Sequence, residues 1–374
     1  MIRGIYFKNY KAFKEGDVDI RPITLIIGKN SSGKSSICKL LPLLSKSLTN
    51  HYQAPFLLDN DGVSVGAKYN DVFRNHANAG LVLGVVSAKG LRLESQFVIN
   101  GGRLNAYLNR CSQEGADPII LVDEEKGVSE RGMFSDIFLK DLGLKRNAIQ
   151  MSVDYISPLR REAQYAIRYK GKGYCNKVGD DGANAYDLLI DSFLDDTPLY
   201  KNVSLWMYNN LEGQKLVIKR LGEESEVFGF YVERGGVLVN LADVGQGVSQ
   251  LLPIIVQSFL PSSHKADVTV IEQPALHLHP AAHAAVAERL AKAISNTKKR
   301  YVIESHSENM LLCFRKLVHE KRLNANDIMV YFVHNDEGEA YLQRITITDD
   351  GRLSSWPEGV FSEGFELMSS IYSE

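Results

Sequence analysis

The sequence predicts an α/β fold in which helices cover a sheet with parallel strands. A short apolar, β-branched run at residues 23–27 is followed by a glycine- and serine-rich loop and then by a helical pattern. From residue 241 onwards, predicted helices at 248–259 and 281–295 alternate with predicted strands at 268–272 and 300–305. Strands that alternate with helices imply a parallel sheet covered by helices.

The middle of the chain has a different pattern. Residues 81–110 form short alternating runs separated by KG and NGG, which predict an antiparallel meander. Helices are predicted at 131–143 and at about 184–212, and strands over 215–241 with a glycine turn at 235–236. We therefore expect a discontinuous head domain (1–50 and 215–345), an inserted lobe with antiparallel strands and helices (51–214), and a C-terminal segment packed on the head (346–374).

The composition is that of an ordinary soluble globular protein, with 374 residues of which 44% are hydrophobic and 24% charged. No apolar run is long enough for a transmembrane helix, and we expect no membrane association. Four cysteines without pairing or metal spacing suit a reducing cytoplasm. The net charge of -2 provides no general attraction to nucleic acid.

Residues 28–35, GKNSSGKS, match the phosphate-binding pattern G-x-x-x-x-G-K-[ST] between a predicted strand and a predicted helix. Glycines let the backbone direct its N–H groups at phosphate oxygens, and the helix N-terminus adds positive potential. Lys34 is expected to reach the β- and γ-phosphates, and the Ser35 hydroxyl to bind Mg²⁺. The predicted cofactors are ATP and Mg²⁺, and the predicted contacts are Gly28, Lys29, Asn30, Ser31, Ser32, Gly33, Lys34, Ser35 and Ser36.

Two later strand ends supply candidates for the metal and the attacking water. The predicted strand at 268–272 ends in Glu272, whose carboxylate can bind Mg²⁺ directly or through water. Gln273 follows, at a place where many ATP-hydrolysing proteins have a second carboxylate. The next strand leads to His306, which can contact the γ-phosphate or the attacking water. The candidate catalytic residues are thus Glu272, Gln273 and His306, with Ser35 and Glu272 as metal ligands.

Two further patterns have competing interpretations. His277, His279 and His283 have ligand-like spacing, but no cysteine or carboxylate close by completes a metal shell, so a metal site is not favoured. Residues 155–177 interleave basic and aromatic side chains, which suits nucleic acid, a protein partner or a solvated loop. Arg160 can instead approach the nucleotide. The basic and aromatic residues are Arg160, Arg161, Arg168, Lys170, Lys172, Lys177, Tyr155, Tyr165, Tyr169 and Tyr174.

The order of these motifs resembles ABC-type P-loop ATPase heads, and within them the RecF, structural-maintenance-of-chromosomes (SMC) and OLD-like group. The stretches that carry the resemblance are FKNYKAFKE, ITLIIGKNSSGKSS, LADVGQGVSQLLPI, IEQPALHLHP and IESHSENML. It implies a mixed-sheet head and a homodimer, or a higher oligomer. In such a dimer, ATP lies between the phosphate loop of one head and the signature segment of the other, which residues 241–254 (LADVGQGVSQLLPI) resemble. Gly245 and Gly247 would bring backbone amides to the γ-phosphate. Ser249 would replace the usual signature serine, whose place Gly245 occupies.

One branch of this group is more closely similar. Its features are the E-Q-P variant, a Y-x-x-P-L-R stretch at residues 155–160, and a C-terminal W-P-x-G-F-F stretch at 356–361. The chain departs from it at Ala275, where glutamate is usual, and at Val360, where phenylalanine is usual. The branch resembles AAA-type ATPases of bacteria and archaea, many related to anti-phage defence systems with a separately encoded effector. Asp349 and Asp350 predict a hairpin turn and not the D-x-D pair of a Toprim nuclease.

Glutamine at position 273 has a kinetic consequence. It can orient an attacking water but cannot accept its proton, and GTPases that use glutamine in this way turn over slowly unaided. The sequence therefore predicts slow hydrolysis and a long-lived ATP-bound dimer, unless His306 or another residue activates the water. Two other functions stay open: a RecF-like DNA-binding repair or recombination ATPase, and an ATP-binding scaffold without turnover.

Overall fold

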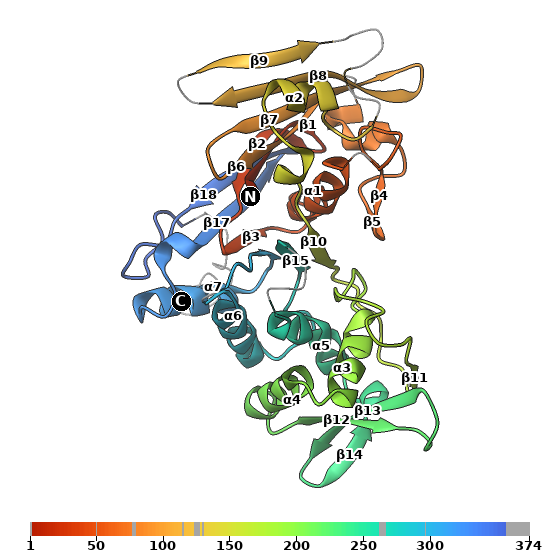
Figure 1. The fold of residues 1–374 in the computed structure, drawn as a ribbon. Helices are drawn as coiled ribbons and strands as arrows, with labels where there is room; N and C mark the ends of the chain where they lie inside the picture. Colours follow the sequence, from red (N-terminus) through yellow and green to blue (C-terminus); the bar gives the residue numbers. More distant parts are fainter. Residues whose placement is uncertain are drawn as a thin grey trace. The chain divides into compact units, whose positions relative to one another are not determined.

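The structure, a computed structural model, divides the chain into two compact units (Figure 1). It describes residues 2–49, 51–76, 80–113, 116–122, 128, 131–261, 267–295 and 297–356. Unit 1 comprises Met1–Val153, Arg300–His306 and Asn324–Glu374, and unit 2 comprises Asp154–Lys299 and Ser307–Leu323. Unit 1 holds both the phosphate loop and residues 51–153, which the sequence placed in the inserted lobe. The domain boundaries at 50 and 215 stay a prediction.

A mixed sheet forms the framework of unit 1. The order of its strands is β16 (Tyr301–Glu304), β3 (Ile23–Gly28), β17 (Ile328–Asp336), β18 (Glu339–Ile345), β2 (Phe13–Asp19), β1 (Ile2–Tyr10), β6 (Leu81–Ser87), β7 (Arg92–Asn100), β8 (Arg103–Gln113) and β9 (Ala116–Val122). β3 is parallel to both β16 and β17, and β18 is parallel to β2. The other neighbours are antiparallel. The predicted meander at 81–110 is confirmed as β6, β7 and β8.

The core of unit 1 surrounds β3. All six residues of this strand are buried, as expected for a parallel strand with neighbours on both sides and covered faces. Helix α1 (Lys34–Ser47) follows it through the phosphate loop (Figure 1). The smaller elements of this unit are β4 (Asp59–Asn60), β5 (Val63–Ser64), α2 (Asp136–Asp141), and short 3-10 turns at Tyr69–Val72, Arg74–His76, Arg146–Ala148 and Ala325–Asp327.

Helix α2 is shorter than the predicted helix at 131–143. Ser135 caps its N-terminus, because the Ser135 hydroxyl accepts a hydrogen bond from the backbone N–H of Phe138. The residues before it are not helical, since the N–H of Met133 donates to the carbonyl of Ser47 at 2.6 Å. Gly143, with φ of 65°, follows the end of the helix.

Unit 2 combines two small groups of strands with most of the helices. β10 (Val153–Ile156), which lies mainly in this unit, neighbours β15 (Val268–Glu272). A second sheet contains β11 (Ile167–Arg168), β12 (Lys215–Arg220), β13 (Val227–Arg234) and β14 (Val237–Asn240), with α3 (Asn184–Leu194) and α4 (Pro198–Asn210) beside it (Figure 1). The other helices are α5 (Gln246–Phe259), α6 (Pro280–Ile294) and α7 (Glu308–His319).

The stretch predicted to be helical at about 184–212 contains two helices. α3 ends at Leu194, and Asp196 takes a left-handed conformation with φ of 53°. Pro198 then occupies the first turn of α4, where its missing N–H is no loss. The Asp-Thr-Pro sequence at 196–198 therefore separates the end of α3 from the start of α4.

The C-terminal stretch is described only as far as Trp356, so Val360 and Phe361 lie outside the described residues. The turn predicted at Asp349 and Asp350 is confirmed. Ile347 and Leu353 form an antiparallel bridge across it, and the N–H of Thr348 donates to the carbonyl of Arg352 at 2.8 Å. Within the described residues, none of the helices has the length and apolar character needed to cross a membrane.

Tyr10 joins the N-terminal hairpin to the first turn of α1. Its fully buried hydroxyl donates to the carbonyl of Ser36 at 2.9 Å. We predict that Tyr10→Phe lowers the free energy of unfolding by about 1 kcal/mol, because one buried hydrogen bond is lost while the ring stays. Urea denaturation measures this. Tyr6→Phe is the control: its partner Glu15 is exposed, so the loss is expected to be smaller. Equal losses would contradict the account.

Candidate nucleotide site

Two glycines shape the phosphate loop. Gly28 has φ of 151°, and a Cβ atom there would lie 2.6 Å from the carbonyl oxygen of Val333. Gly33 has φ of 108°, and a Cβ atom there would lie 2.9 Å from the ring of Phe13. Gly33 is also the N-cap of α1 and has no side chain to cap it. The first N–H groups of the helix can therefore serve an anion.

The polar side chains of the loop fit a triphosphate. Lys34 is buried, and its Nζ donates to the carbonyl of Lys29 at 2.6 Å. Ser32 is also buried, and among the described residues its hydroxyl has no hydrogen-bond partner. A buried hydroxyl of this kind calls for a further polar group, which phosphate oxygens would supply. Lys29, Asn30 and Ser31 are exposed on the outer part of the loop, and Ser36 lies in the first turn of α1.

Glu304 is a functional candidate that the sequence analysis missed. It ends β16 opposite Ile26 of β3, and its Oε2 accepts a hydrogen bond from the Ser35 hydroxyl at 2.8 Å. Burial raises the pKa of the Glu304 carboxyl, while the Ser35 hydrogen bond and the charges of Lys34 and Lys39 oppose the rise. A serine hydroxyl beside a carboxylate is a pair of oxygen ligands suited to Mg²⁺.

His306 follows two residues later at the same edge of the sheet. The backbone N–H of Ser305 donates to the carbonyl of Ile26 at 3.1 Å, which extends the parallel pairing beyond β16. The imidazole of His306 reaches solvent, yet partial desolvation and the positive charge of Lys34 lower its pKa. The ring is therefore neutral at pH 7 and can accept a hydrogen bond or a proton.

In unit 2, the end of β15 is held by side chains from β10 and from the segment that follows it. Glu272 is buried, and the hydroxyl of Tyr155 donates to its Oε1. The guanidinium of Arg160 donates to the backbone carbonyl of Glu272 and, at 3.1 Å, to that of Gln273. Gln273 has φ of 46°, in the left-handed region that few residues other than glycine adopt. Arg160 thus stabilises the unusual backbone conformation at the proposed water-positioning residue.

The backbone of Arg160 is hydrogen-bonded to the side chain of Gln250 in α5. The Gln250 side chain accepts from the N–H of Arg160 at 3.2 Å and donates to its carbonyl at 2.9 Å. Burial lowers the pKa of Arg160 to about 10, and the charge of Glu272 opposes this shift. The guanidinium stays protonated at neutral pH, and it links the helix after the signature segment to Glu272 and Gln273.

The signature segment leads through a 3-10 turn (Leu241–Asp243) into α5, which starts at Gln246, two residues earlier than predicted. Gly245 is the N-cap, and a Cβ atom on Gly247 would lie 2.6 Å from the carbonyl oxygen of His277. Both glycines line a cavity of about 580 Å³ within unit 2. The hydroxyl of Ser249 is turned into the helix and donates to the carbonyl of Gln246 at 3.0 Å. A nucleotide contact by Ser249 stays a prediction.

Two of the three histidines at 277–283 have local roles. His279 caps α6 by accepting from the N–H of Ala281, and His283 contacts the Ser307 hydroxyl at 2.8 Å and the carbonyl of Leu278 at 3.2 Å. Within the described residues, the three rings do not come together as a metal-binding group.

The basic segment at 155–177 is extensively paired with carboxylates. Its ion pairs join Arg161 to Asp181, Lys170 to Asp187 and Lys172 to Asp195. The hydroxyls of Tyr165 and Tyr169 donate to Asp243 and Asp191. These contacts offset much of the positive charge that a phosphate backbone would need. A nucleic-acid or protein partner at this segment stays a prediction.

The candidate residues thus form two groups. The phosphate loop, Ser35, Glu304 and His306 belong to unit 1, and the parallel pairing of β3 and β16 brings them to one edge of the sheet. Glu272, Gln273, Gly245, Gly247 and Ser249 belong to unit 2.

Family models match three parts of the chain. Residues 1–83 match a family model described as an AAA ATPase domain. Residues 128–312 match a second model, whose description names an AAA domain and connects it with the AbiEii toxin of type IV TA systems. Residues 323–369 match a family of unknown function. Among curated proteins, no sequence match is found.

Two solved structures are similar in fold. An Smc head bound to the C-winged helix domain of ScpA has a TM-score of 0.52 and 10% identity, with 92% of this chain and 98% of that chain covered. The Smc head domain of Pyrococcus furiosus, bound to the C-terminal domain of ScpA, has a TM-score of 0.50 and 9% identity, with 99% of both chains covered. The fold is that of an ABC- or SMC-type ATPase head. Together with the AAA models, it supports ATP binding and ATPase activity.

Arg160 offers a test of the strand-end geometry. We predict that Arg160→Lys slows single-turnover hydrolysis by about ten- to a hundredfold with little change in ATP affinity. Lysine keeps the charge but lacks the rigid planar fork and the second terminal nitrogen, which donates to the carbonyl of Gln250. Rapid-quench assays with saturating Mg-ATP measure the rate. Arg161→Lys is the matched control, since Arg161 is exposed and its guanidinium forms an ion pair with Asp181. If both variants hydrolyse alike, Arg160 does not position Gln273.

We predict that metal binding depends on pH, because the pKa of the Glu304 carboxyl is raised by burial. Its carboxylate is charged above its pKa and neutral below it, and burial places that pKa above the ordinary value of about 4.3. Mg²⁺ affinity in the presence of ATP should therefore fall on acidification at a higher pH than for an ordinary carboxyl. Titrations between about pH 5 and 8 measure this. Glu304→Gln should weaken Mg²⁺ binding and flatten the dependence, whereas the exposed Glu308→Gln should leave both unchanged. An unaltered profile in Glu304→Gln would exclude this role.

Proposed function

We propose that this chain is a cytoplasmic, Mg²⁺-dependent ATPase switch that hydrolyses ATP slowly. In this proposal two copies pair head-to-tail around ATP, with the phosphate loop of one copy and the signature segment of the other on the same nucleotide. The lifetime of the ATP-bound dimer then sets how long the switch stays on. The switch controls a separately encoded effector in prokaryotic anti-phage defence.

The observation that carries this proposal is the end of β15. Gln273 directly follows the buried Glu272, and its backbone is in the left-handed region. The backbone carbonyl of Gln273 accepts a hydrogen bond from Arg160. The side-chain amide of Gln273 can orient a water through its oxygen and its N–H₂ group but has no basic site. Orientation without proton transfer supports slow turnover, as in GTPases that act without an activating partner.

Two other groups are able to accept the proton. Glu304 and the neutral His306 are both in unit 1, close enough to the phosphate loop to feel the charge of Lys34. Glu304 shares a hydrogen bond with the predicted metal ligand Ser35, so metal coordination is its better-supported role. His306 is exposed and neutral, which suits contact with the γ-phosphate or the attacking water.

The role in defence rests on resemblance, not on geometry. The E-Q-P motif and the stretch at 155–160 are similar to those of defence-associated ATPases, and the AAA model over residues 128–312 is described in connection with a toxin–antitoxin system. The Smc heads of similar fold are bound to a domain of ScpA. This supports the proposal that the present chain also acts through a partner protein.

Single-turnover hydrolysis tests the switch. Wild type, Lys34→Ala and Gln273→Glu are mixed with Mg-ATP while light scattering follows association. We expect wild type to dimerise on ATP and hydrolyse it slowly, Lys34→Ala to do neither, and Gln273→Glu to hydrolyse at least about tenfold faster because a carboxylate can accept the proton.

Three results would argue against the proposal. Fast wild-type turnover that Gln273→Glu does not alter would move water activation to another group, with His306 first to test. ATP that stays intact in the dimer would favour a scaffold. Hydrolysis stimulated by DNA, with salt-sensitive DNA binding, would favour the repair or recombination function.

A further inference from the structure

The third histidine of the stretch 277–283 makes two hydrogen bonds that reach beyond its own helix. His283 is half-buried near the start of α6. Its Nδ1 atom lies 2.8 Å from the Ser307 hydroxyl, and its Nε2 atom lies 3.2 Å from the Leu278 carbonyl. The carbonyl can only accept, so Nε2 carries the proton, and Nδ1 of the neutral ring accepts from the Ser307 hydroxyl. One ring thus joins the loop before α6 to the start of α7.

The loop that His283 holds begins at Gln273. Two turns lead along it: the N–H of Leu276 donates to the Gln273 carbonyl, and the N–H of Leu278 donates to the Ala275 carbonyl, both at 3.2 Å. His283 then binds the carbonyl of Leu278. The backbone that follows Gln273 is therefore held at its far end as well as at the strand end.

The other partner of His283 directly follows His306. Ser307 is buried, and its hydroxyl caps α7 by accepting from the N–H of Met310 at 3.2 Å. On the other side of His306, the N–H of Ser305 donates to a carbonyl of β3 at 3.1 Å. The exposed imidazole of His306 thus stands on a backbone that is hydrogen-bonded on both sides.

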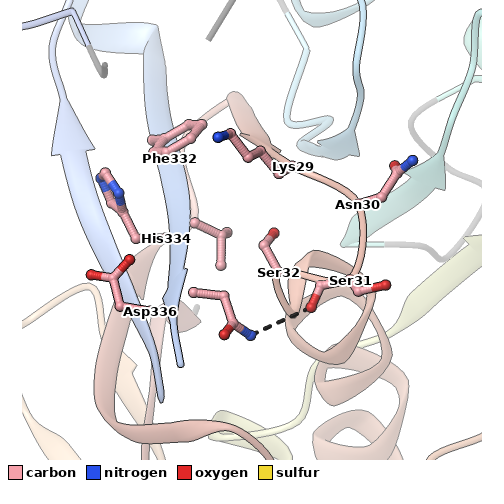
Figure 2. Close-up of a pocket in the computed structure, with 9 residues that line it drawn as sticks. Lys29, Asn30, Ser31, Ser32, Phe332, His334 and Asp336 are labelled. Atoms are coloured by element: carbon pink, nitrogen blue, oxygen red, sulfur yellow. Dashed lines mark hydrogen bonds between the residues drawn. The ribbon is translucent and has the colours of Figure 1, made fainter. Parts of the chain in front are cut away.

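The two flanks of the phosphate loop are held in different ways. On the β17 flank, the amide of Asn335 donates to the carbonyl of Ser31 at 3.4 Å, so a side chain binds the loop itself (dashed line in Figure 2). On the β16 flank, a backbone bond to β3 comes just before His306, and the chain then leaves the sheet for α7. The bond between Ser307 and His283 holds the chain directly after this point.

We propose that His283 is a positioning residue for ATP hydrolysis. Through Leu278 it fixes the loop that begins at Gln273, and through Ser307 it fixes the backbone after His306. The inference rests on the proposed function, in which Gln273 and His306 face the attacking water. It adds that one shared side chain sets the geometry of both. A small misplacement of groups around a reacting atom slows the reaction even when the substrate still binds.

Variants at position 283 separate the two bonds. The amide of asparagine lies near the place of Nδ1 and that of glutamine near the place of Nε2. His283→Asn therefore keeps a partner for Ser307, His283→Gln keeps a donor for Leu278, and His283→Ala loses both. In rapid-quench assays with saturating Mg-ATP, we expect single-turnover hydrolysis to slow about three- to tenfold in the asparagine and glutamine variants and about ten- to a hundredfold in His283→Ala. The Kd for ATP should stay within about twofold of wild type.

Val286→Ala is the matched control for a purely structural role. Val286 is fully buried on the same helix, so its truncation costs stability through lost packing alone. We expect Val286→Ala to lower the urea midpoint and to hydrolyse ATP at the wild-type rate. The first turns of α6 and α7 have a second contact, from the Asn309 amide to the Pro280 carbonyl at 3.4 Å, which the position-283 variants keep.

The possible failures are distinguishable. The inference is wrong if His283→Ala hydrolyses as fast as Val286→Ala, or if the rates of all variants simply follow their urea midpoints. Slowing in only one of the asparagine and glutamine variants contradicts the claim that one ring serves both segments. These results leave the switch untouched. If wild type hydrolyses no ATP, the inference and the proposed function fail together. A fast wild type contradicts the slow switch alone, because the comparison among position-283 variants still holds.

Discussion

The site depends on one constraint, the parallel pairing of β3 with β16 on one side and β17 on the other. The carboxyl ends of parallel strands meet at one edge of the sheet, so the loop after β3 has Glu304 on one flank and residues 333–336 on the other. The backbone approach is close enough that only glycine fits at position 28, against the carbonyl of Val333. The pairing therefore fixes the positions of the loop, of the hydrogen-bonded pair Ser35 and Glu304, and of residues 333–336 together.

A buried charge organises unit 2 in a comparable way. An unpaired guanidinium in a protein interior would be strongly destabilising, and Arg160 is tolerated because carbonyls of Glu272, Gln273 and Gln250 accept its hydrogen bonds. The same bonds stabilise the left-handed conformation of Gln273 and tie it to α5. A change at the start of α5, where the signature glycines lie, can therefore reach Gln273 through two side chains, Gln250 and Arg160.

The sequence was informative where local chemistry decides the structure. Gly28, Gly33 and Lys34 defined the loop by spacing alone, and the turn residues at 89–90 and 100–102 defined the meander. The break at Asp196–Pro198 had a local signal, a proline that can begin but not continue a helix. The contact between Ser35 and Glu304 had none, because the two residues are 269 positions apart and meet only through strand pairing. The sequence left the role of the basic segment at 155–177 open for the same reason, since its aspartate partners and the burial of Arg160 are tertiary features.

The central claim is that hydrolysis, slowed by an amide at position 273, times the ATP-bound dimer. Its most direct test is to preassemble wild-type dimers on radiolabelled ATP, dilute them into unlabelled nucleotide, and follow product formation and dimer dissociation on one time axis. The account predicts that both proceed with the same slow rate constant. Dimers that dissociate with their ATP intact, or that persist long after it is hydrolysed, would contradict it.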